Sequence, residues 1–69
     1  MRTYGRLREK IREKFGTIGA FSLAIEKDTS SISKKLNGHV PWDQNDIEKS
    51  CNLLDIPIGK VPEYFFYDE

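Results

Sequence analysis

The side chains that most often carry catalysis are scarce in this chain of 69 residues. His39 is the only histidine and Cys51 the only cysteine, whereas a catalytic triad or a zinc site brings several such groups together. Cys51 falls on the inner face of an expected helix, where a thiol serves as a small apolar residue. A single cysteine forms no internal disulfide and suits a reducing cytoplasm. We therefore expect no enzyme, no metal and no other cofactor.

The acidic residues of the second half are a weaker chemical signal. Metal binding or acid–base work could use Asp43, Asp46, Glu48 and Asp55. Helix capping and a solvated face explain these residues more simply. Gly16 and Gly19 flank Thr17 and Ile18, but no strand or P-loop pattern precedes them, so they do not predict a nucleotide site.

The segment of residues 28–38, DTSSISKKLNG, combines hydroxyl groups with two lysines. Ile32 and Leu36 lie one helical turn apart, so on a helix they face inward while the hydroxyls and Lys34 point outward. Hydroxyl groups exchange hydrogen bonds with base edges in the major groove, and a lysine reaches a guanine edge or a phosphate. A plain solvated helix explains the same composition, since serine favours helix N-termini.

The spacing of the apolar residues predicts helices throughout and no strand, because period-two alternation is missing. The expected helices cover residues 4–14, 18–26 and 29–37, a fourth that begins after Asp43, and a short element after Pro57. The expected N-caps are Thr3, Thr17, Asp28 and Asp43, and the expected stops are Gly16 and Gly38. Trp42 and Ile47 occupy the two positions of a hydrophobic staple around Asp43. The fold class is all-α, with four helices plus a short fifth.

Composition and charge narrow the class of protein further. The chain is 38% hydrophobic and 32% charged, which is typical of a globular domain, and its length predicts one domain over residues 1–69. No apolar run approaches the ~18 residues of a membrane span, and no secretory signal is present. We therefore expect a cytoplasmic protein without a membrane partner.

The net charge of zero hides an asymmetry between the two halves. Residues 1–40 hold nine Lys and Arg against four acids, a net charge of +5, and residues 41–69 carry −5. Such asymmetry indicates a basic binding face with an acidic remainder. Ordinary surface charge on two helices is the alternative.

The order of motifs from residue 17 to 38 resembles the helix-turn-helix of the Cro and lambda-repressor family of phage regulators. The segment FSLAIEKDTSSISKKLNG places Phe21-Ser22, Ile25, Ser30-Ser31-Ile32-Ser33 and Asn37-Gly38 at the family's positions. One expected helix precedes the unit and two follow, and the tail IPIGKVPEYFF is similar to that of small Cro-like proteins of Gram-positive phages.

This resemblance implies a lambda repressor-like helix-turn-helix bundle that binds double-stranded DNA at operator sites in a bacterial host cell. The third helix enters the major groove. The implied base contacts are Thr29, Ser30, Ser33 and Lys34. The implied phosphate contacts are Thr17, Gly19, Ser22, Lys35, Asn37, His39 and Arg6.

A palindromic operator and a homodimer are also implied, because such modules bind paired half-sites. The aromatic segment of residues 64–67 is the expected dimer surface, although Tyr64 and Phe65 could instead seal the core.

The chain departs from the family pattern at four places in this unit. Glu26 stands where the family usually has glycine, although a non-glycine residue can follow helix geometry there. Lys27 stands where the family has an apolar residue, and Lys35 occupies the place of the last core hydrophobe. Ile18 replaces the glutamine that often binds phosphate.

The alternative function is a small helical adaptor, antitoxin-like or antirepressor-like, that binds a protein partner and no DNA.

Overall fold

The chain folds into helices joined by short turns, and the computed structural model describes residues 4–66. The elements are α1 Gly5–Phe15, α2 Ile18–Ile25, α3 Thr29–Leu36, α4 Gln44–Leu54, the 3-10 turn η1 Ile58–Lys60 and α5 Val61–Phe65. Within residues 4–66 there is no strand, which confirms the predicted all-α class with four helices and a short fifth. In that range no helix has both the length and the apolar character needed to cross a membrane.

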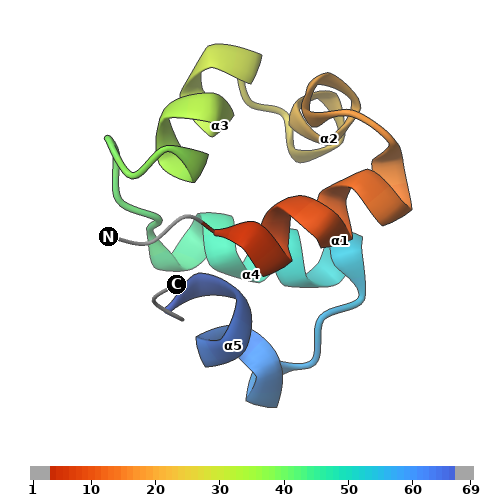
Figure 1. Cartoon of the computed structure of the whole chain (residues 1–69), viewed down its shortest axis with the longest axis vertical. Coiled ribbons are helices and arrows are strands. Elements are labelled where there is room, and N and C mark those ends of the chain that lie inside the picture. Colours follow the sequence, from red (N-terminus) through yellow and green to blue (C-terminus); the bar gives the residue numbers. More distant parts are fainter. Residues whose placement is uncertain (1–3, 67–69) are drawn as a thin grey trace.

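Figure 1 shows α1 and α4 in the middle of the molecule, with the α2–α3 pair on one side and α5 on the other. The helix contacts follow this order, since α1 packs on α2, α4 and α5, and α2 packs on α3 and α4. The arrangement leaves α3 at the edge of the molecule, in contact mainly with α2.

The turns around α2 and α3 follow from single residues. Gly16 ends α1 with a φ of 85°, and the Thr17 side chain accepts a hydrogen bond from the Ala20 amide at 3.1 Å, as expected of an N-cap. We expected Glu26 to follow helix geometry, and this expectation is wrong. Glu26 ends α2 in the left-handed region, at a φ of 62°. The Glu26 backbone takes the conformation that a glycine at this place would adopt most easily.

Two of the expected caps differ in the structure. Asp28 occupies the N-cap position of α3, but its side chain makes no capping hydrogen bond, so the predicted acceptor role is wrong. Thr3 lies outside the described residues, and the N-cap position of α1 is held by Tyr4.

The end of α3 and the start of α4 form as predicted. Gly38 has a φ of 81° and donates its amide to Lys35 O, while the His39 amide donates to Lys34 O at 2.9 Å. This pair of bonds is the Schellman arrangement that glycine permits at a helix end. Asp43 Oδ1 accepts from the Asp46 amide at 2.8 Å and caps α4.

The core lies where the five helices meet. Its fully or nearly fully buried members are Tyr4, Leu7, Ile11, Phe21, Ile25, Ile32, Leu36, Cys51, Leu54, Ile56 and Phe65. Burial raises the pKa of the Cys51 thiol, which keeps it protonated and agrees with its expected role as an apolar residue. Trp42 packs edge-on against Phe65 with ring centroids 5.2 Å apart, so the C-terminal aromatic segment closes the core at this point.

Candidate functional site

The outer face of α3 carries the polar side chains that the sequence predicts at the surface. Thr29, Ser30 and Lys34 are exposed and Ser33 is half-buried, whereas Ile32 and Leu36 are completely buried. All four implied base-contacting residues therefore lie on one face of one helix. Within residues 4–66, Lys34 takes part in no ion pair, so its ammonium group is available to a partner.

The N-terminal ends of α2 and α3 lie next to each other. A Cβ atom built on Gly19 would lie 3.9 Å from Thr17 Oγ1 and 4.0 Å from Thr29 Oγ1. Two implied phosphate contacts, Thr17 and Gly19, therefore border the first residue of α3. Thr17 Oγ1 already accepts a hydrogen bond from Ala20, but its hydroxyl proton remains free to be donated.

The C-terminal end of α3 is tied to α1. Arg8 donates from Nη2 to Leu36 O at 2.9 Å and to Asn37 Oδ1 at 2.8 Å. A guanidinium is well placed at a helix C-terminus, where the backbone carbonyls make the potential negative. Asn37 and His39 are exposed here, and the hydrogen bond from Arg8 leaves the Asn37 amide NH₂ as the outward donor.

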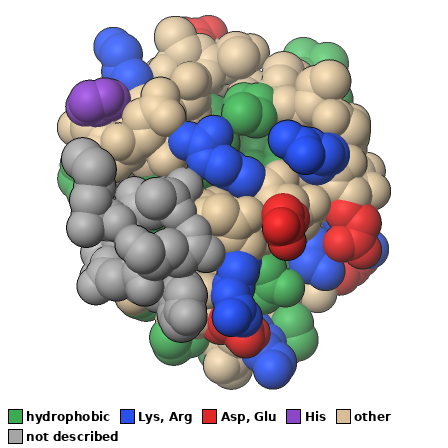
Figure 2. All heavy atoms as spheres, viewed as in Figure 1, with side chains coloured by type: hydrophobic (Ala, Val, Ile, Leu, Met, Phe, Trp, Pro, Cys, Tyr) green, Lys and Arg blue, Asp and Glu red, His purple; other side chains and the backbone are tan. Residues whose placement is uncertain are grey.

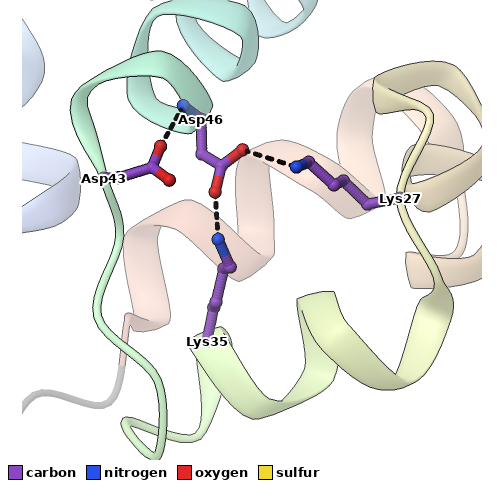
Figure 3. Close-up of polar contacts among 4 residues, drawn as sticks. All are labelled: Lys27, Lys35, Asp43 and Asp46. Atoms are coloured by element: carbon purple, nitrogen blue, oxygen red, sulfur yellow. Dashed lines mark hydrogen bonds and ion pairs between the residues drawn. The ribbon is translucent and has the colours of Figure 1, made fainter.

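Lys35 is not the phosphate contact that we expected. Its side chain is only 10% exposed, and Lys35 Nζ donates to Asp46 Oδ2 in the interior between α3 and α4. Lys27, in the turn before α3, places its Nζ 3.6 Å from Asp46 Oδ1. Figure 3 shows both ammonium groups converging on the Asp46 carboxylate, one from each end of α3. We call Lys27, Lys35 and Asp46 the buried charge cluster, in which Lys35 and Asp46 are buried and Lys27, 38% exposed, closes the outer side.

Asp46 itself was expected on a capping position or a solvated face, and the structure corrects this expectation because its side chain is 1% exposed. Burial raises the pKa of the Asp46 carboxyl, but the hydrogen bond and charge of Lys35, helped by Lys27, more than offset this effect. The pKa therefore lies below its ordinary value of 3.8, and the group is ionised at neutral pH.

Ser22 and Arg6 are also placed away from the α3 face. Ser22 is 1% exposed and donates its hydroxyl to Ile18 O at 2.8 Å within α2, so it cannot touch a phosphate. Arg6 Nη1 bonds Glu63 Oε1 at 2.6 Å, which holds this guanidinium on the α1–α5 side. Among the implied phosphate contacts, the structure brings Thr17 and Gly19 to one end of α3 and Asn37 and His39 to the other.

The charge asymmetry of the sequence is largely used inside the fold. Basic residues of the first half pair with acids of the second half at Arg6–Glu63, Lys14–Asp55, Lys27–Asp46 and Lys35–Asp46. Figure 2 accordingly shows Lys and Arg groups interspersed with Asp and Glu on the face it presents. Lys34 is the exposed lysine of α3 that these pairs leave out, so the expected basic face depends on it at this helix.

Sequence reasoning missed two residues that shape this site, Arg8 and Asp46. For Asp46 a signal was present: Lys35 stands at the place of the family's last core hydrophobe, and a charge in such a place requires a buried counter-charge. For Arg8 we find no comparable signal, since it lies among other charged residues of α1.

The chain belongs to the family described as Protein of unknown function (DUF739), which matches residues 2–68. Among solved structures, it is similar to the solution structure of the modulator of repression (MOR) of the temperate bacteriophage TP901-1 from Lactococcus lactis. The two chains share 35% identity over 94% of this chain and 88% of that chain, with a TM-score of 0.85. Among curated proteins, no sequence matches. Neither comparison names the Cro and lambda-repressor family that the motifs resemble.

Proposed function

We propose that this chain is a sequence-specific double-stranded DNA-binding protein, a Cro-type transcriptional regulator that acts at operator sites. The observation that carries the proposal is the outer face of α3. There, hydroxyl groups and an uncommitted lysine stand exposed over two fully buried apolar residues, at the edge of the molecule. The likeness to a phage modulator of repression supports a regulatory role of the same broad kind.

In this mechanism α2 and α3 act as a helix-turn-helix, and the N-terminal half of α3 enters the major groove. Thr29, Ser30 and Ser33 exchange hydrogen bonds with base edges, and Lys34 reaches a guanine edge. Their short hydroxyl side chains require the helix backbone to approach the bases closely.

Phosphate groups are held at the two ends of α3. Thr17 and Gly19 border its first residue, and amides at the N-terminus of α2 favour an anion there. Asn37 and His39 offer donors at the other end. Contacts on both sides of the groove fix the register of α3 on the duplex.

A homodimer doubles these contacts on a palindromic operator. Phe65 is core and Tyr64 is half-buried, so among residues 64–66 the expected aromatic dimer surface narrows to Phe66, which is 51% exposed. Tyr67, the last residue of that segment, lies outside the described residues. Ile58, at 75% exposure, lies with Phe66 along an apolar groove between α4 and α5. Packing this groove against a second copy of the chain would remove the exposed side chains of Ile58 and Phe66 from water, which favours a dimer.

Selection from random duplexes at two salt concentrations tests the proposal. We expect a palindromic motif, and an affinity that falls with salt with a log–log slope of several units. The variant Lys34→Ala should lose about 1–3 kcal/mol of binding and relax the preference at one or two base pairs. The control variant Lys49→Ala removes a lysine from α4 and should keep the motif. No enriched motif, or the same motif with Lys34→Ala, contradicts the proposal.

A further inference from the structure

The buried charge cluster is unusual because apolar residues would fill its place at lower cost. Taking a carboxylate and an ammonium group out of water costs several kcal/mol per ion. Replacing such a pair with apolar side chains of similar volume is often neutral or stabilising. Stability alone therefore does not explain the cluster, whereas a hydrogen-bonded pair has one preferred geometry that apolar packing lacks.

The contacts of Asp46 hold α3 at two points. Asp46 Oδ2 binds Lys35 in the last turn of α3, and Asp46 Oδ1 lies 3.6 Å from the ammonium group of Lys27, before the first turn. The carboxylate is itself fixed to the start of α4, because the Asp46 amide donates to Asp43 at 2.8 Å (Figure 3). Lys35 Nζ also lies 5.8 Å from the centre of the Trp42 ring, which packs on the core.

The contact between Lys35 and Asp46 lies on the side of α3 that faces away from the proposed DNA contacts. At 3.6 residues per turn, Lys35 and Ser33 are separated by about 160° around the helix axis. A rotation of α3 that moved Lys35 away from Asp46 would turn Ser33 and its neighbours through the same angle. The cluster thus fixes the direction in which the outer face points.

We propose that Asp46 is a positioning residue that sets the orientation of α3 through Lys35 and Lys27, and thereby the discrimination between DNA sequences. This inference rests on the proposed function for its consequence at DNA. Its first claim, the orientation of α3 in the free protein, does not depend on DNA.

The test uses the double variant Lys35→Met/Asp46→Leu, which removes the pair and keeps an apolar side chain at each place. We expect a melting temperature no lower than that of the wild-type chain. Residual dipolar couplings of α3 should no longer fit the wild-type orientation, while those of α1 and α4 still do. The ratio of affinity for the selected operator to affinity for random duplex should fall about tenfold, the cost of a lost base contact.

A second variant keeps the test decisive if the double variant does not fold. Lys27→Met leaves the Lys35–Asp46 pair intact and removes only the ion pair between Lys27 and Asp46, which lies before the first turn of α3. It should shift the couplings of Thr29 and Ser30 at nearly unchanged melting temperature. The control Lys14→Met/Asp55→Asn removes an exposed ion pair between α1 and the end of α4 and should change neither readout.

Unchanged α3 couplings in a folded variant overturn the positioning role, whatever the wild-type chain does with DNA. Reoriented α3 with an undiminished affinity ratio overturns its link to discrimination. A wild-type chain that binds no duplex selectively refutes the proposed function instead, and the couplings still test Asp46.

Discussion

Replacing Lys35 alone with methionine should be one of the most damaging changes in this chain. The Lys35→Met variant keeps the volume of the side chain but leaves the Asp46 carboxylate, 1% exposed, without its hydrogen-bond donor. Removing one partner of a buried ion pair typically costs 3–5 kcal/mol, because the other charge remains buried. Lys27 still lies 3.6 Å from Asp46 Oδ1, so we expect the lower end, about 3 kcal/mol.

This loss is large against the total stability of so short a chain. A domain of 69 residues is stable by about 3–10 kcal/mol. A change of about 3 kcal/mol corresponds to a decrease in melting temperature of about 10–25 °C for a domain of this size. Thermal unfolding followed by far-UV circular dichroism, together with urea titration, measures both quantities.

Two further variants separate the buried charge from the lost side chain. Adding Asp46→Leu to Lys35→Met should restore the melting temperature, because no charge is then left unpaired. The exposed pair of Lys14 and Asp55 is the matched control, and Lys14→Met should cost at most about 1 kcal/mol. A Lys35→Met variant that melts within about 4 °C of the wild-type chain, no more than the shift expected of the control, would refute this reasoning.

Three other predictions address acid stability, packing and assembly. The pKa of Asp46 is lower in the folded chain than its ordinary value of 3.8, so the ionised carboxylate stabilises the fold above pH 3.8, and this contribution is lost as the pH falls toward the folded pKa. The Asp46→Asn variant should lack this part of the acid unfolding curve. An acid unfolding curve identical to that of the wild-type chain would contradict the lowered pKa of Asp46. Ile32→Ala should lower the free energy of unfolding by about 2–5 kcal/mol through a cavity under α3, whereas Leu23→Ala, at a side chain 81% exposed, should leave the urea midpoint nearly unchanged. Phe66→Ser should keep the melting temperature and shift sedimentation toward the monomer, so an unchanged sedimentation coefficient would remove Phe66 from the dimer surface.

Much of the fold was predictable because local signals decide it. The apolar stripe at Leu7 and Ile11, the Thr17 and Asp43 caps and the Gly38 stop act within a few residues, and each is found in place. Such signals depend on backbone hydrogen bonds and side-chain periodicity, which the sequence displays directly.

Two of the errors, at Lys35 and Arg6, arose where a distant partner decides the outcome. Lys35 was expected at a phosphate because the family resemblance implied it, whereas Asp46, eleven residues later and on another helix, binds its ammonium group in the interior. Arg6 was likewise drawn away by Glu63 of α5. Long-range pairs of this kind leave no periodic trace in the sequence. Ser22 is a different case, because it lies on the inner side of α2 and its hydroxyl donates to Ile18 O within the same helix.

The outer face of α3 was predictable because it needs no partner within the fold. Ile32 and Leu36 assign the inner side by their spacing, and the remaining side follows as exposed. The proposed function depends on what this side of α3 contacts.

Amide chemical shifts of the ¹⁵N-labelled chain, recorded during titration with a pool of duplexes and then with a selected one, show directly whether the outer face of α3 contacts DNA. We expect the largest changes at Thr29, Ser30, Ser33 and Lys34, with smaller ones at Thr17 and Gly19, and none along α5. Unmoved α3 signals at saturating duplex, or changes confined to the α4–α5 groove, would contradict the account.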